Sequence, residues 1–228
     1  MTSGRITTQR LIMEFYMGVI ERREREKQQR KTEIIAAAEK VFSAKGYDNS
    51  TMDDVAAEAE LSKGAIYFYF KSKAEICLSI LLKSLYEIRN AFQTIIAQNQ
   101  NGFEKFKSVC SSYLDFYDNH PNFLTAVTNF RSHKDHCDAE SVVLQEVMET
   151  NRSITSLIQQ ILLSGVQDNS IISEVEPEIL AKSFWGDLNG LLLSLSISDN
   201  DARMNGYEHP DRIFIYILNL LSNSIKKR

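Results

Sequence analysis

Glycine and proline are rare in this chain, and their scarcity constrains the fold more than any other feature. The 228 residues contain nine glycines and three prolines. Both residues mark turns, and a sandwich or barrel of short strands needs many turns. Apolar residues recur instead at the three-and-four spacing of helices over most of the sequence. We therefore predict an all-α fold built mainly from long helices.

The composition is that of an ordinary globular protein. Apolar residues make up 43% and charged residues 25%, close to the usual averages. The three cysteines form no CxxC pair, and their odd number argues against a disulfide framework and for a reducing compartment. The apolar stretch 11–20 lacks a signal-peptide cleavage site, and the run 184–197 is too short to span a bilayer. We expect a soluble cytoplasmic protein without a membrane partner.

Charge is distributed unevenly along the chain, although its net value is only −4. Residues 1–73 carry 13 basic and 11 acidic side chains, whereas residues 74–228 carry 13 and 19. The segment 22–31 alone has six basic and two acidic residues. This asymmetry suggests a basic contact surface on an acidic body, as in nucleic-acid binders. A solvated helix face is the simpler alternative for such a charge run.

Cap signals predict two short helices joined by a tight turn. Thr51 stands three residues before Asp54, which is the spacing of a capping box, and opens a helix over 52–59. Ser62 is the N-cap candidate of the next helix. The turn between them contains Glu60, and the whole arrangement is that of a helix-turn-helix.

Longer helices are predicted on both sides of this motif, over residues 21–44, 72–98, 103–118, 121–133, 139–167, 177–197 and 211–227. The helix over 21–44 ends at Gly46, where a left-handed cap is easily formed. The helix over 72–98 opens with a capping box from Ser72 to Glu75. The last two are apolar on nearly every side, so each needs cover on every side. A second copy of the chain supplies that cover most simply, and we predict a homodimer.

The short helix after Ser62 carries a set of residues suited to the major groove of DNA. Lys63 is a cation, Gly64 permits close approach, and Ala65 offers a methyl group for thymine. The phenols of Tyr67 and Tyr69 can reach phosphates or base edges. The alternative is a three-helix subdomain in which the tyrosines belong to a core.

Lys73 lies in the first turn of the following helix. Its charge and the free N–H groups of that turn could together hold one phosphate.

The stretch from Ile34 to Lys73, IIAAAEKVFSAKGYDNSTMDDVAAEAELSKGAIYFYFKSK, resembles the N-terminal domain of the Tet-repressor (TetR) family. The resemblance implies an all-helical homodimer that binds double-stranded operator DNA through a three-helix domain. The larger C-terminal domain would bind a small effector and form the dimer. The implied DNA contacts are Thr51, Ser62, Lys63, Gly64, Ala65, Tyr67, Tyr69 and Lys73. Two positions depart from the family: Glu60 replaces a turn glycine, and Ala65 replaces a common threonine.

The resemblance also divides the chain. Residues 1–27 would form an N-terminal extension and the start of the first helix, and Met1–Tyr16 would be an extra helical arm or an upstream artefact. Residues 28–88 would form the DNA-binding domain, with the helix-turn-helix at about 51–70. Residues 89–228 would form the ligand-binding and dimerisation domain.

The C-terminal half resembles the regulatory domains of TetR proteins that sense apolar effectors. The implied effector is a small apolar molecule such as an acyl-CoA, a fatty acid or an aromatic cation. Aromatic residues at helical spacing are more often core than pocket. With that alternative open, the candidate ligand residues are Tyr113, Phe116, Phe130, Trp185 and Asn189.

Motifs for catalysis and metal binding give no positive signal. Glycine-rich phosphate loops, HExxH and GxSxG are absent from the sequence, so we predict a protein that is not an enzyme and needs no cofactor. His133, His136 and Cys137 could in principle hold zinc, but their spacing matches no recurrent site, and we predict no metal. The alternative to a repressor is a helical scaffold or adaptor without sequence-specific DNA binding.

Overall fold

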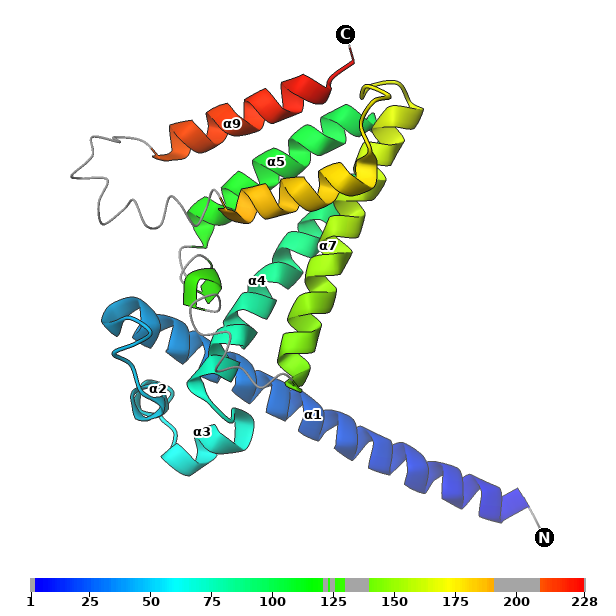
Figure 1. Ribbon diagram of the computed structural model, residues 1–228. Helices are drawn as coiled ribbons and strands as arrows, with labels where there is room; N and C mark the ends of the chain where they lie inside the picture. The colour runs from blue at the N-terminus through cyan, green and yellow to red at the C-terminus, as the bar shows by residue number, and fades with distance from the viewer. Residues whose placement is uncertain (1–2, 121–122, 124–125, 130–139, 191–209, 228) are drawn as a thin grey trace. The chain divides into compact units, whose positions relative to one another are not determined.

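The computed structural model describes residues 3–120, 123, 126–129, 140–190 and 210–227. The labelled helices are α1 (Ser3–Lys45), α2 (Met52–Glu58), α3 (Lys63–Tyr69), α4 (Lys73–Ile96), α5 (Gly102–Asn119), α7 (Val142–Gln167) and α9 (Pro210–Ile225) (Figure 1). Residues 177–190 are also helical. Within these ranges the only β-pairing is an isolated bridge between Ile171 and Lys226. The predicted all-α fold is confirmed.

The chain forms two compact units, Met1–Ile76 and Cys77–Arg228. The division lies inside α4, so a single helix begins in the first unit and continues into the second. The domain boundary expected at residues 88 and 89 lies further along the same helix. No helix in the described part of the chain is long and apolar enough to cross a membrane.

Helix α1 is much longer than the predicted 21–44, because it begins at Ser3. Nothing in the sequence before residue 21 stops a helix: Gly18 is an isolated glycine, and a lone glycine costs only about 1 kcal/mol in a helix interior. The arm suggested by the sequence is therefore a continuation of α1. The predicted end is confirmed, since Gly46 has a φ of +77° and its N–H donates to the Phe42 carbonyl at 3.0 Å.

The core of the first unit joins α1, α2 and α3. Ile34 and Phe42 of α1, Val55 of α2, Ile66 of α3 and Phe70 just beyond it are all buried. Their spacing along α1 and α2 is the one from which the helices were predicted. Burial of these apolar faces fixes how the two short helices cross.

The start of α4 has the predicted cap. Ser72 Oγ accepts the Glu75 N–H at 3.2 Å, as expected. The Glu75 carboxylate also accepts the N–H of Lys71 at 2.7 Å, a bond that the sequence analysis did not predict. Both bonds satisfy donors near the helix start, so the cap signal located the helix correctly.

In the second unit, α5 packs against α7, α9 and the helix over 177–190. The closest approach is at Gly102 and Gly165, where a Cβ on Gly102 would lie 2.1 Å from the Gly165 nitrogen. The loop after α7 closes this crossing: Asp168 Oδ2 accepts the Gly102 N–H at 2.7 Å, and Ser170 Oγ accepts the Phe103 N–H at 3.0 Å. Two glycines therefore let the start of α5 touch α7 through the backbone.

Candidate nucleic-acid interface

The helix-turn-helix has the predicted caps and the predicted turn. The Thr51 hydroxyl accepts the Asp54 N–H at 3.1 Å, and the Asp54 carboxylate accepts the Thr51 N–H at 2.9 Å, which completes the capping box. Ser62 Oγ accepts the Ala65 N–H at 3.2 Å. Glu60 has a φ of +54°, and the next N–H, that of Leu61, donates to the Ala56 carbonyl at 2.9 Å. The turn is therefore left-handed at a residue that is not glycine.

Helix α3 presents its predicted recognition face to solvent. Ser62, Lys63 and Gly64 are exposed, and Tyr67 is 46% exposed. A Cβ placed on Gly64 would meet nothing within 4 Å, so this part of the helix can approach another surface closely. Ala65 and Tyr69 are half-buried. Lys63, Gly64 and Tyr67 are exposed as expected, whereas Ala65 and Tyr69 are less exposed than expected. Contact of these residues with DNA remains a prediction.

Acidic side chains of α2 lie close to this face. Asp53 Oδ2 accepts a hydrogen bond from Lys63 Nζ at 2.9 Å, and this bond raises the pKa of Lys63 above its ordinary value. Asp54 accepts the Thr51 hydroxyl at 2.8 Å and the Lys45 ammonium at 2.5 Å. Hydrogen bonds from Lys45 and Thr51 lower the pKa of Asp54 from 3.8 to about 2. Two of the implied DNA contacts, Lys63 and Thr51, therefore already have carboxylate partners.

Lys73 has partners different from the predicted phosphate. Its ammonium donates to the carbonyls of Tyr47 and Ser50, the latter at 2.8 Å, and lies 4.2 Å above the Tyr47 ring centroid. These contacts tie the first turn of α4 to the loop that precedes α2. Because two of the three ammonium donors are used within the fold, Lys73 acts here as a residue that positions the loop.

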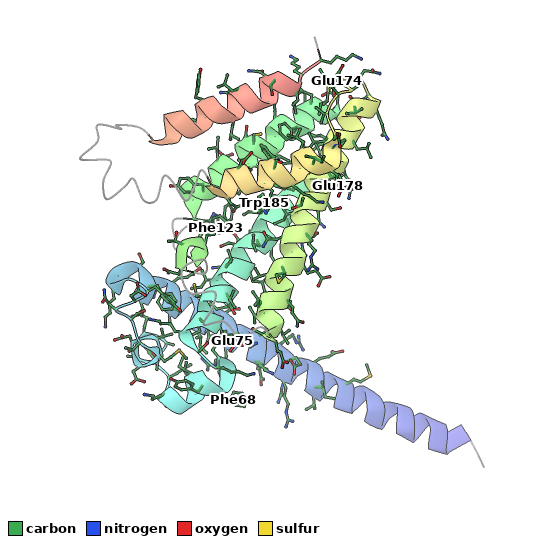
Figure 2. All side chains as sticks on the ribbon, in the orientation of Figure 1. Phe68, Glu75, Phe123, Glu174, Glu178 and Trp185 are labelled. Carbon is green, nitrogen blue, oxygen red and sulfur yellow. The ribbon has the colours of Figure 1, made fainter. Side chains whose placement is uncertain are left out.

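Three of the ligand candidates come together in the core of the second unit. The rings of Tyr113 and Trp185 meet edge to face at 5.5 Å, and Tyr113 Oη donates to Asn189 Oδ1 at 3.4 Å. Asn189 Nδ2 donates to the Trp185 carbonyl at 2.6 Å, and Trp185 Nε1 donates to Asn151 Oδ1 at 3.0 Å. Trp185, labelled in Figure 2, lies on the helix over 177–190. Burial raises the pKa of Tyr113. The cluster is a hydrogen-bonded polar chain inside an aromatic core.

The fourth candidate, Phe116, belongs to a different group. Its ring stacks on His120 at 4.0 Å and meets Phe123 at 5.3 Å, and His120 Nε2 lies 2.8 Å from a Glu87 carboxylate oxygen. Phe116 therefore does not join the Trp185 cluster through any described contact.

Several predicted positions lie outside the described residues. These are Phe130, His133, His136, Cys137 and Leu192. Among the residues that are described, no group of three or more His, Cys, Asp or Glu side chains could hold a metal ion.

Comparison with known proteins identifies the helix-turn-helix. Residues 34–80 match the family described as bacterial regulatory proteins, tetR family. The match spans the last turns of α1, all of α2 and α3, and the start of α4. The chain belongs to the tetR family.

Relatives of this tetR-family chain extend beyond the matched domain. The fatty acid metabolism regulator protein of Bacillus subtilis is 22% identical over 175 residues, which is 77% of this chain and 88% of that protein. The HTH-type transcriptional regulator YhgD of the same organism is 29% identical over 161 residues, or 67% and 76% of the two chains. Both names are those of regulators rather than enzymes.

A solved structure shows that the likeness includes the fold of both halves. The crystal structure of FadR from Bacillus subtilis in complex with stearoyl-CoA superposes with a TM-score of 0.65 and 20% sequence identity. It covers 85% of this chain and 98% of FadR. The tetR fold therefore extends over most of the described residues.

Glu60 stands at the turn position where the tetR family usually has glycine. Its positive φ predicts how a glycine at this position would change the stability of the protein. Glu60→Gly should raise the free energy of unfolding by up to about 1 kcal/mol, because glycine adopts a positive φ without steric cost. Urea denaturation measures the change. Glu60→Gln is the control, since it removes the charge and keeps the strain. A lower stability of the glycine variant would contradict the strain argument.

Lys73 gives a second prediction, which separates its two roles. Lys73→Met should lower the free energy of unfolding by about 2 kcal/mol, because two charge-assisted hydrogen bonds are lost. Lys71→Met, at an exposed neighbouring lysine, is the matched control. Unchanged stability together with a salt slope of DNA binding lowered by about one would instead support the phosphate contact.

The sequence prediction missed Phe68, which lies on the recognition helix and is 75% exposed. Phe68 and Tyr69 also line a groove of about 500 Å³ with α1 residues that include Arg23, Lys27 and Arg30. In the aromatic run from Tyr67 to Phe70, the first two side chains are exposed, the third is half-buried and the last is buried, a pattern that the sequence analysis did not resolve. A count of helical register from buried Ile66 would have placed Phe68 outside.

Proposed function

We propose that this chain is a ligand-responsive transcriptional repressor that binds a near-palindromic operator as a homodimer. The observation that carries the proposal is the recognition face of α3, where an exposed cation, an open glycine and an exposed tyrosine follow a fully capped turn. Such a face fits the major groove of DNA. The family of the chain supports the same function.

DNA binding is tested by mobility shift with the full-length protein on duplexes selected from random sequence. A repressor binds selected duplexes with an affinity that falls steeply as salt rises, because counterions are released from the phosphates. Lys63→Ala should lower the salt slope by about one. Lys107→Ala is the matched control, since Lys107 is an exposed cation of the second unit that pairs with Glu104. Failure to select any duplex would support the scaffold alternative.

The homodimer is proposed to use α9 and the helix that begins at residue 177. On α9, Tyr216 is 64% and Leu220 is 54% exposed, one helical turn apart on the same face. Leu218, which also lies on the predicted dimer helix 211–227, is only 3% exposed and is buried within its own unit. The exposed pair is therefore the better marker of the proposed interface.

The effector is proposed to be a long-chain acyl-CoA that binds in the second unit. The support is the relationship to a fatty acid metabolism regulator and the fold shared with a stearoyl-CoA complex. The buried cluster around Trp185 offers an aromatic wall and polar groups in one place. Binding there must displace packed side chains, because the chain of hydrogen bonds from Tyr113 to Asn151 fills this part of the core.

Helix α4 is the proposed link between effector and DNA, since it begins in the first unit and ends in the second. A tilt of α4 would change the spacing of the two recognition helices in the dimer. To release most of the bound operator, the effector must favour the non-binding state by a few kcal/mol.

Trp185 fluorescence tests the effector, because Trp185 is the only tryptophan. Stearoyl-CoA should quench Trp185 and release operator DNA at the same concentrations, whereas coenzyme A without an acyl chain should do neither. Stearate and an aromatic cation test the other two effector classes. Quenching without release would contradict the proposed coupling, since reciprocal linkage requires both effects together.

A further inference from the structure

The most exposed large apolar side chain in the described part of the protein lies on the recognition helix. Phe68 is 75% exposed, whereas its neighbours Ile66 and Phe70 are buried. A phenylalanine left in water contributes little to the stability of the fold. Its exposure at this place, between the two tyrosines expected to meet DNA, indicates a role in what α3 contacts.

The surroundings of Phe68 on α3 are small and open. Gly64 and Ala65 lie four and three residues before it and therefore share its side of the helix. A Cβ at Gly64 would meet nothing within 4 Å. Phe68, which is labelled on α3 in Figure 2, is thus a large side chain beside neighbours that carry only a hydrogen atom and a methyl group.

The ring of Phe68 also contacts a neighbouring aromatic ring. It meets the ring of Tyr69 edge to face, at 5.1 Å between centroids and an interplanar angle of 88°. A phenylalanine has only two side-chain torsions, so it loses less conformational freedom in a contact than a long flexible side chain does.

The chemistry of the ring selects its target. A phenyl group can neither donate nor accept a hydrogen bond, so phosphate oxygens and most base edges offer it nothing. The apolar group that the major groove presents is the C5 methyl of thymine. We propose that Phe68 reads a thymine methyl in each half-site and so determines part of the operator sequence. This inference rests on the proposed DNA-binding function.

Deoxyuridine substitution tests the contact directly, because it removes only the C5 methyl of thymine. A duplex selected from random sequence by the full-length protein is resynthesised with each thymine replaced in turn. For the wild-type protein, deoxyuridine at one thymine position of each half-site should weaken binding by about fourfold. This is the effect expected when one methyl group is lost from an apolar contact.

The variant Phe68→Ala tests whether the response to deoxyuridine depends on Phe68. At the position that responds in the wild type, Phe68→Ala should bind the thymine and deoxyuridine duplexes with equal affinity. Phe68→Leu should keep part of the difference in affinity between the two duplexes. Tyr67→Phe is the matched control, since it changes an aromatic side chain of the same helix and should leave the thymine preference intact. Phe68 is exposed, so the melting temperature of Phe68→Ala should equal that of the wild type.

Two results would overturn the inference. In one, deoxyuridine changes the affinity at no thymine position. Phe68 would then act as an apolar wedge between base pairs, because such a contact does not depend on the thymine methyl group. In the other, Phe68→Ala keeps the wild-type ratio between the two duplexes. Failure to select any duplex is a different outcome, since it would contradict the proposed function itself.

Discussion

Gly102→Ala is expected to lower the free energy of unfolding by about 3 kcal/mol or more, at the upper end of what overpacking costs. The added Cβ would lie 2.1 Å from the nitrogen and 2.2 Å from the Cα of Gly165, and 2.9 Å from the Ile161 carbonyl oxygen. All three are backbone atoms of α7, which no change of rotamer can move. The helices must separate, and the bonds from Asp168 and Ser170 to the start of α5 must lengthen or break.

Thermal unfolding, followed by circular dichroism and by Trp185 fluorescence, measures this loss. Gly18→Ala is the control, because it adds the same methyl group to a helix position with nothing within 4 Å and should not destabilise the protein. A melting temperature of Gly102→Ala within about 2 °C of the wild type would mean that the crossing of α5 and α7 is looser than the structure shows.

Leu220→Arg is expected to convert the protein to a monomer. The substitution places a charge in a seam that must exclude water, and two-fold symmetry repeats it on the partner. A monomer engages only one half-site, so operator affinity should fall by between roughly a hundredfold and ten-thousandfold. Size-exclusion chromatography with light scattering gives the mass, and the mobility shift gives the affinity.

The control for this change is Met148→Arg, at another exposed apolar position, on α7. It should leave both mass and DNA affinity unchanged. Leu218→Arg should behave differently from Leu220→Arg, because Leu218 is buried in its own unit and its replacement should lower the melting temperature as well. A Leu220→Arg protein that keeps the mass of two chains would exclude this face of α9 from the interface.

Features set by near neighbours in the chain could be predicted from the sequence. The caps at Thr51 and Ser62 join groups three residues apart, and the left-handed residues at Glu60 and Gly46 follow from the ends of single helices. Local hydrogen bonding and steric exclusion decide such features, and both can be read from a few consecutive residues.

Features that depend on distant segments could not be predicted in this way. Lys73 reaches a carbonyl 26 positions earlier in the chain, and Gly102 meets Gly165 across a helix crossing. The pairing of Trp185 with Tyr113, without Phe116, likewise depends on how α5 packs against the helix over 177–190. Periodicity shows that a side chain faces inward, but it does not show which inward side chains meet.

The ion pair between Lys63 and Asp53 has a consequence for how fast such a protein searches a genome. On the proposed contact of Lys63 with DNA, the phosphates of any sequence compete with the Asp53 carboxylate for the Lys63 ammonium. This competition weakens binding to all sequences alike and shortens each stay on incorrect sites. Discrimination between sites then depends on side chains that contact bases, while Asp53 limits the time lost between them.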